Sequence, residues 1–292
     1  MHLVGGTSRH HIDAMSLDPI KRAENRLPTL FIPHGGGPCF FMDPPPGDPH
    51  AWESMAAYLR GIAASQHVRP KAILVISAHW ETARPTVGSG KRPPLLFDYY
   101  GFPEHTYRLE YPAPGSPELA ARVRALLASA GIASDEDAER GFDHGVFVPF
   151  LLAFPEATIP VVQLSLRTDL DPAAHLAIGR ALAPLRDEGV LIVGSGMSYH
   201  NLREFWSTRP EDVHAAERFD AWLAEAVEQP ESDARNAQLA AWSEAPGARA
   251  AHPRSEHLLP LMVAAGAGGA DRGRRMYRDR VFGKAVSGFQ FG

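Results

Sequence analysis

The segment AILVISAHW, residues 72–80, decides the fold class of this chain. Its first five residues are all apolar, without the alternation of a strand that has one solvated face. Such a run is typical of a strand covered on both faces, as in a parallel sheet. Similar runs occur at residues 30–32, 159–164 and 190–193. We therefore predict four buried strands spread along the chain.

Helical patterns lie between these strands. Apolar residues recur at helical spacing over residues 117–130, 172–185 and 213–228. Strands that alternate with amphipathic helices favour an α/β fold. We predict a single domain with a central, mainly parallel or mixed sheet flanked by helices. This domain is expected to span residues 27–292, and residues 1–26 are interpreted as a disordered extension without a signal-peptide core.

Composition and charge exclude several classes of partner. A net charge of −5 gives no electrostatic reason to expect nucleic acid or a membrane surface as a partner. The one cysteine, Cys39, excludes an internal disulfide and a cysteine-based zinc site, and we interpret it as a small buried residue. Because no apolar run reaches about 18 residues, we expect a cytoplasmic protein. The patch Arg272, Arg274 and Arg275 is interpreted as a solvated turn, and the oligomeric state stays open.

Residues 92–115 form a long segment without a helical pattern, and they are rich in proline, glycine and aromatic residues. A long ordered loop of this kind is usually functional. Tyr99, Tyr100 and Phe102 could cover an aromatic ligand, or they could simply pack the loop against itself. The sequence favours neither interpretation.

Histidines in suggestive positions carry the functional signal. His34, His79 and His200 each follow an apolar run, and His257 opens an apolar helical pattern. Parallel strands bring such ends together at one edge of an α/β sheet, where ligands bind. His144 has similar glycine-bounded surroundings. We therefore predict a metal site at the carboxyl ends of the strands.

The predicted site suits catalysis better than structural metal binding. Imidazole nitrogens bind zinc, iron, copper or nickel, and the chain has no thiolates for a closed zinc site. Three protein ligands leave positions open for water or substrate. The remaining histidines could then act as acids or bases near neutral pH.

The motifs together resemble the class III extradiol ring-cleavage dioxygenases of the DOPA-dioxygenase-like branch. The resemblance covers roughly residues 27–292, and its motifs stand in the family's order and spacing. These motifs are PHGGGP (33–38), SAHW (77–80), FDYYGFP (97–103), YPAPGSP (111–117), GFDHG (141–145), PVVQLS (160–165), HNLR (200–203) and EHLLPL (256–261).

The resemblance implies a role for each histidine. His34, His79 and His257 match the metal ligands of the family. His200 matches an acid/base histidine that could also approach the metal as a ligand. His144 matches a pocket histidine that could hydrogen-bond oxygen or substrate.

Glu256 is the alternative third ligand, since many class III enzymes use two histidines and a glutamate. On a helix, adjacent residues point about 100° apart, so Glu256 and His257 would not share one ion. We favour His257 and keep Glu256 as the alternative.

The implied reaction is cleavage of a catechol ring by O2, with a small aromatic catechol such as DOPA as substrate. Fe(II) is the implied working metal, and Zn(II) could occupy the site of the purified protein without supporting redox chemistry. The residues leave two other readings open: a zinc-dependent hydrolase, and a non-enzymatic metal-binding protein on the same scaffold. Arg203 is the nearest candidate for binding a substrate carboxylate, and a surface ion pair would explain it equally well.

Overall fold

The computed structural model describes residues 26–292. The extension expected over residues 1–26 therefore lies, except for Arg26, outside the described residues. The described residues form an eight-stranded sheet with the order β4-β3-β5-β2-β6-β1-β8-β7. The strands are β1 (Thr29–Pro33), β2 (Ala72–Thr82), β3 (Thr86–Gly88), β4 (Asp135–Asp137), β5 (Val161–Arg167), β6 (Val190–Gly196), β7 (Gly273–Val281) and β8 (Lys284–Phe291).

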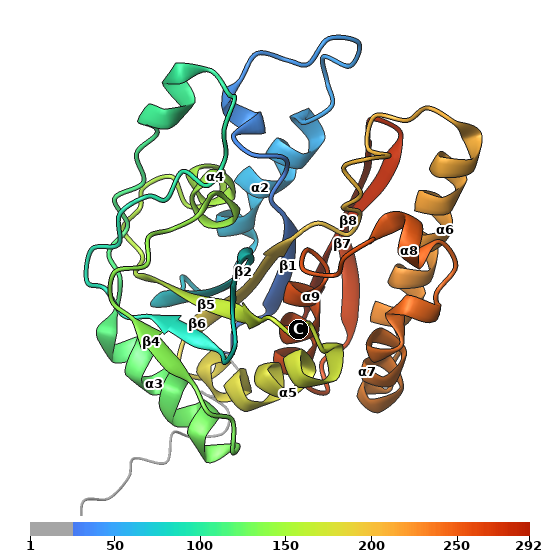
Figure 1. Cartoon of the computed structure of the whole chain (residues 1–292). Coiled ribbons are helices and arrows are strands. Elements are labelled where there is room, and N and C mark those ends of the chain that lie inside the picture. Colours follow the sequence, from blue (N-terminus) through green and yellow to red (C-terminus); the bar gives the residue numbers. More distant parts are fainter. Residues whose placement is uncertain (1–25) are drawn as a thin grey trace, which may run out of the picture.

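The four predicted strands form the centre of this sheet. β5, β2, β6 and β1 are neighbours and run parallel to one another. The outer strands make the sheet mixed, because β8 pairs antiparallel with β1, and β7 pairs antiparallel with β8. The predicted α/β domain with a central mixed sheet is confirmed (Figure 1).

Helices cover both faces of the sheet. They are α2 (Glu53–Ser65), α3 (Pro117–Ser129), α4 (His144–Ala153), α5 (Pro172–Leu182), α6 (Pro210–Val227), α7 (Ser232–Ala240), α8 (Ala248–Ala251) and α9 (Leu259–Gly268), with short 3-10 turns η1 (Cys39–Phe41), η2 (Glu104–Arg108), η3 (Ala183–Arg186) and η4 (Trp242–Glu244). The three predicted helices at 117–130, 172–185 and 213–228 correspond to α3, α5 and α6.

Two consecutive residues of β6 show which helices share a face. A Cβ on Gly194 would collide with the carbonyl oxygen of Pro260 in α9, whereas Ser195 donates to the carbonyl of Gly145 in α4. Successive side chains of a strand point to opposite faces. Helices α9 and α4 therefore lie on opposite faces, with α5 packed beside α9 and α2 beside α4 (Figure 1).

The C-terminal hairpin corrects one sequence interpretation. Arg274 and Arg275 lie in β7, so the arginine patch is not a solvated turn. The guanidinium of Arg275 is 3.1 Å from the carboxylate of Asp220, a buried residue of α6. Along β7 only every fourth residue is buried, so the strand contains no continuous apolar run.

The segment 92–115 also differs from the expected irregular loop. It contains the 3-10 turn η2, so it is not wholly irregular. Leu95 forms an isolated parallel bridge with Phe142, which ties this segment to the chain just before α4. Within the described residues, no helix is long and apolar enough to cross a lipid bilayer.

Candidate metal centre

The five histidines singled out from the sequence meet at the carboxyl-terminal edge of the central strands. His34 follows β1 directly, and His79 lies inside β2 rather than after it. The register between β2 and β5 shifts between Ile76 and Glu81, so His79 stands in a stretch that does not pair with β5. This irregularity lets the His79 ring turn toward His34, 4.9 Å away between ring centroids.

His200 and His257 reach the site from two loops. Gly194 and Gly196, which precede His200, are part of β6 and do not form a flexible turn. A Cβ on Gly196 would collide with the carbonyl oxygen of His257, which shows that β6 needs glycine to let this backbone approach. The rings of His200 and His257 stack with centroids 3.3 Å apart and an interplanar angle of 15°.

Glu256 and His257 precede α9, which begins at Leu259. The argument from the 100° spacing of helical residues therefore does not apply to this pair. The choice between Glu256 and His257 as candidate ligand depends instead on their contact. Nδ1 of His257 lies 2.9 Å from Oε1 of Glu256. Glu256 thus accepts a hydrogen bond from Nδ1 of His257.

Nitrogen positions fit a single metal ion. The Nε2 atoms of His34 and His79 are 3.2 Å apart, and with His257 they form a group whose ligand atoms all lie within 4.8 Å of one another. A metal–nitrogen distance of about 2.1 Å places neighbouring ligand nitrogens roughly 3 Å apart. The three histidines thus suit one ion without a large rearrangement.

Hydrogen bonds fix the tautomer of His34. Ser195 donates its single hydroxyl hydrogen to the carbonyl oxygen of Gly145, so its oxygen accepts from Nδ1–H of His34 at 3.1 Å. Nδ1 of His34 therefore carries the proton, and Nε2 presents a lone pair to the centre.

His144 is the first residue of α4, and Asp98 holds it. Oδ1 of Asp98 accepts from the backbone N–H of His144 at 2.9 Å and from Nδ1–H at 2.8 Å. Asp143, the preceding residue, does not orient His144, because the Asp143 carboxylate accepts instead from Ser77, Gln163 and Arg140. The residue before α4 thus does not cap it with its own side chain.

Burial keeps the candidate ligand histidines neutral. It lowers the pKa of His34 and His79 well below the usual value, and the neighbouring histidines lower it further. For His257 burial and His200 lower the pKa to about 3, against the opposing effect of Glu256. Neutral imidazole is the form that binds a metal.

The two site carboxylates stay ionised. Burial opposes ionisation of Glu256, but hydrogen bonds from His200 and His257 outweigh it and hold the pKa of this carboxyl well below its usual range. For Asp98 burial is likewise outweighed by the hydrogen bonds from His144, which lower its pKa. The site thus combines neutral imidazoles with fixed negative charges behind them.

Aromatic residues of the segment 92–115 line one side of the site. Tyr99 is buried, donates to the carbonyl of Thr106, and lies 5.8 Å from the His144 ring. Phe102 contacts Tyr99, and its ring lies where a Cβ on Gly37 would meet it at 2.9 Å. Tyr100 is 92% exposed. Loop packing therefore accounts for Tyr99 and Phe102, and Tyr100 faces solvent.

A second arginine, besides the one singled out from the sequence, lies beside the histidine cluster. Arg203 is exposed, and among the described residues only its backbone N–H makes a hydrogen bond, to Asn201. Arg254 instead forms a bidentate pair with Glu81 and lies 3.3 Å from Oε2 of Glu256.

Cys39 is buried as predicted. Burial raises the pKa of its thiol to about 12, the opposite of an activated nucleophile.

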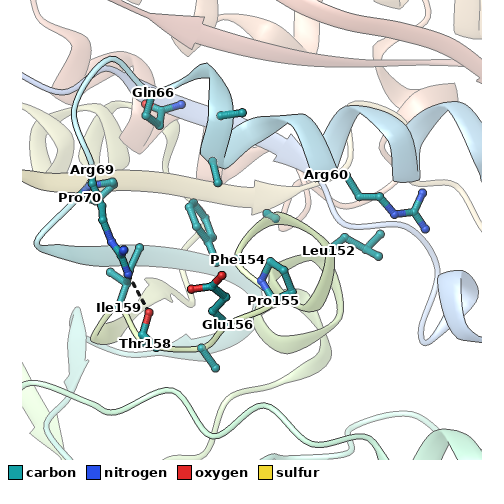
Figure 2. A pocket seen from close by; sticks show the side chains of 14 residues that line it. Arg60, Gln66, Arg69, Pro70, Leu152, Phe154, Pro155, Glu156, Thr158 and Ile159 are labelled. Atoms are coloured by element: carbon teal, nitrogen blue, oxygen red, sulfur yellow. Dashed lines mark hydrogen bonds between the residues drawn. The ribbon is translucent and has the colours of Figure 1, made fainter.

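A pocket of about 540 Å³ lies away from the histidines. It is lined by the ends of α2 and α4 and by the segment before β5, with Arg69 donating to Thr158 at 2.8 Å (Figure 2). Pro70 and Ile159 come just before β2 and β5, so this pocket opens at the amino-terminal edge of the sheet. None of the described residues that line it is a histidine, and it is separate from the metal centre.

Comparison with known proteins agrees with this fold. The family model of the catalytic LigB subunit of aromatic ring-opening dioxygenases matches residues 28–288. The chain therefore belongs to this family of class III extradiol ring-cleavage dioxygenases, and it is an enzyme. This assignment overturns the non-enzymatic reading.

Individual relatives place the chain in the DOPA-dioxygenase-like branch. It is 46% identical over 202 residues to a 4,5-DOPA dioxygenase extradiol of Beta vulgaris, covering 69% of this chain and 74% of that protein. It is 38% identical over 278 residues to dioxygenase tasH of Hapsidospora irregularis, covering 91% and 85%. The crystal structure of an uncharacterized Escherichia coli K12 protein superposes with a TM-score of 0.70 at 30% identity, covering 91% of this chain and 100% of that one.

Proposed function

We propose that this enzyme opens the ring of a small catechol with O2 next to its two hydroxyl groups, using one metal ion bound by His34, His79 and His257. The observation that carries the proposal is the convergence of these three neutral imidazoles, with Nε2 of His34 and Nε2 of His79 only 3.2 Å apart. Iron is the proposed metal, because ring cleavage by O2 needs an ion that changes oxidation state, which zinc does not.

Bound Fe(II) would supply open positions for both catechol oxygens and for O2, so that the reactants meet in a fixed orientation. The chain itself supplies the surroundings. The side chains of His34 and His257 are almost fully buried, so bulk water is kept from the ligand nitrogens. The packed ring of Tyr99 limits the site beside His144.

His200 and His144 are the proposed proton carriers. With Nδ1 of His200 3.3 Å from Glu256 and Nδ1 of His144 bonded to Asp98, both Nε2 atoms are free to accept a proton. His200 would take a proton from a catechol hydroxyl as the substrate binds, and would return it to the ring-opened product. His144 would hydrogen-bond the reacting oxygen from the other side of the centre.

The direct test is to load the metal-free protein with Fe(II) under anaerobic conditions, add a panel of catechols including DOPA and protocatechuate, and admit O2. We expect oxygen uptake together with a new yellow absorbance from the ring-opened semialdehyde. Protein loaded with Zn(II) is the matched control, and it should take up no oxygen. Failure to consume O2 across the whole panel at full iron occupancy would contradict the proposal, and hydrolysis of an ester or amide by the zinc form would point to a hydrolase.

A further inference from the structure

Two carboxylates stand behind the histidine cluster, and each of them serves two rings. Asp98 lies between His144, whose Nδ1 is 2.8 Å from Oδ1, and His79, whose Nδ1 is 3.7 Å from Oδ2. The two rings are close to one another, with centroids 3.8 Å apart. One of them is a proposed ligand and the other a proposed proton carrier.

Glu256 repeats this arrangement with His257 and His200. Its Oε1 lies 2.9 Å from Nδ1 of His257 and 3.3 Å from Nδ1 of His200. These rings are stacked with centroids 3.3 Å apart. Again the carboxylate joins one proposed ligand to one proposed proton carrier.

We infer that Asp98 and Glu256 are a matched pair of positioning residues that each orient one ligand histidine and one proton-carrying histidine, and that neither carboxylate binds the metal. This inference rests on the proposed function, since it assigns the groups that hold the same site. An ionised carboxylate only accepts hydrogen bonds, so a neutral ring bonded to it must carry its proton on Nδ1, as His144 does beside Asp98 and His257 does beside Glu256. His79 and His200 lie farther from the same carboxylates, with Nδ1 at 3.7 Å and 3.3 Å, and we infer the same orientation for them. Nε2 is then left with the lone pair that the metal or the substrate proton needs.

The geometry separates this arrangement from direct coordination. Asp98 with His79 and His144, and Glu256 with His200 and His257, are each close enough to form a metal site of their own. Both groups leave out His34, whose Nδ1 is already committed to Ser195 and whose Nε2 faces Nε2 of His79. Only an ion on the Nε2 side of the rings can include His34.

The backbone contact of Asp98 supports a positioning role. Its Oδ1 also accepts from the backbone N–H of His144 at 2.9 Å, which places it at the amino terminus of α4. There a carboxylate stabilises the helix end and satisfies a free N–H group. The segment 92–115 thereby fixes both the start of the helix and the ring that the helix presents to the site.

Conservative and truncating substitutions distinguish positioning from coordination. Glu256→Gln and Asp98→Asn keep an oxygen that can accept from Nδ1–H, whereas Glu256→Ala and Asp98→Ala remove it. We expect the amide variants to bind Co(II) within about threefold of the wild-type affinity, and the alanine variants to bind it about 10- to 100-fold more weakly. Glu104→Gln is the control, because Glu104 is an exposed residue of η2 whose only ion pair among the described residues is with Arg108.

The visible absorption spectrum of the Co(II) form gives a readout that does not depend on activity. If neither carboxylate is a ligand, the spectra of Glu256→Gln and Asp98→Asn should match that of the wild type. A changed spectrum in Glu256→Gln, together with an affinity as low as that of Glu256→Ala, would show that Glu256 coordinates the ion and would overturn the inference. Wild-type affinity in both alanine variants would overturn it as well.

A second test of the inference measures kcat, which depends on the proposed proton carriers. Asp98→Ala should lower kcat in the wild type but have little further effect in a His144→Ala background, since the carboxylate then has no proton carrier to orient. Equal, additive losses in both backgrounds would contradict the inference for Asp98. The proposed function fails in a different way, because the wild-type protein itself would then bind no metal at the cluster or consume no O2.

Discussion

The hydroxyl group of Ser195 determines which ring nitrogen of His34 carries the proton. Ser195 has a single hydrogen to donate and gives it to the carbonyl of Gly145, so the histidine can only donate to it. The same logic recurs at Glu256, which can only accept from His257. Metal-binding histidines ordinarily have their other nitrogen bonded in this way, because the second partner fixes the orientation of the ring.

Substitution of single histidines should separate ligands from proton carriers. We expect His34→Ala and His79→Ala to lose metal, as measured by metal content after loading with Fe(II) and desalting. His200→Ala should keep most of its metal while kcat falls about 10²- to 10⁴-fold, the range typical of a lost acid or base. Metal loss in His200→Ala as large as in the other two variants would make His200 a ligand.

Among the elements, β6 and α9 show how the site depends on close backbone contact. Gly194 and Gly196 bring β6 against Pro260 and His257, so that the turn carrying Glu256 is pressed onto the strand edge. Helix α9 is buried along its whole length, and Thr29 of β1 donates to its Ala264 carbonyl. The position of the His257 ring therefore follows from strand packing rather than from the local sequence.

Adding a methyl group at this contact should disturb fold and site together. Gly196→Ala would drive Cβ into the carbonyl oxygen of His257, so the chain must shift, and we expect a loss of about 1–3 kcal/mol in the free energy of unfolding together with weaker metal binding. Urea denaturation and Co(II) titration measure the two effects. Gly61→Ala is the matched control in α2. A Cβ added there would meet no atom of the described residues within 4 Å apart from its own helix backbone, so the variant should be neutral or stabilising. An equally stable Gly196→Ala variant with normal metal affinity would show that the close contact is not required.

The central parallel strands were predictable, and the outer strands of the sheet were not. The central strands are recognisable from continuous apolar runs, as in residues 72–77, because no face of these strands meets water. β7 shows one buried residue in four and carries several arginines, so the sequence alone indicated a turn. β3 and β4 contain three residues each, too few for any periodicity.

The histidines of the site were predictable, but their carboxylate partners were less so. Strand ends and glycine-rich neighbours pointed to His34 and His79. Asp98 lies in the quoted motif FDYYGFP without any local sign of its partner, because His144 is 46 positions away in the sequence. Glu256 was recognised, but its role could not be assigned without knowing that the turn precedes α9. Contacts between residues so far apart follow from tertiary packing and not from the spacing of motifs in the sequence.

At the scale of the whole molecule, buried neutral histidines make stability depend on pH. Burial lowers the pKa of His252 from about 6.5 to about 4, and burial also lowers that of His175. Between pH 6.5 and 4 the unfolded chain binds protons that the folded chain does not, so stability is present above pH 6.5 and is lost as the pH falls.

We expect the free energy of unfolding of the metal-free protein to decrease below pH 6.5 by about 1.4 kcal/mol per pH unit for each such histidine. Chemical denaturation at pH 7, 6 and 5 measures the slope. His252→Gln, which can still donate to the carbonyl of Ser198, should reduce the slope by the share of one group. Stability that stays constant from pH 7 to pH 5 would contradict the neutral state of these rings.

We propose that one metal ion binds at Nε2 of His34, His79 and His257, and that Asp98 and Glu256 contact the Nδ1 side of the rings without binding the ion. A crystal structure of the protein loaded with iron under anaerobic conditions, with anomalous data at the iron edge, tests it most directly. We expect one anomalous peak about 2.0–2.2 Å from the three Nε2 atoms, with Glu256 still hydrogen-bonded to His257. A peak bonded to a carboxylate oxygen of Glu256 or Asp98, or no peak within the cluster, would contradict it.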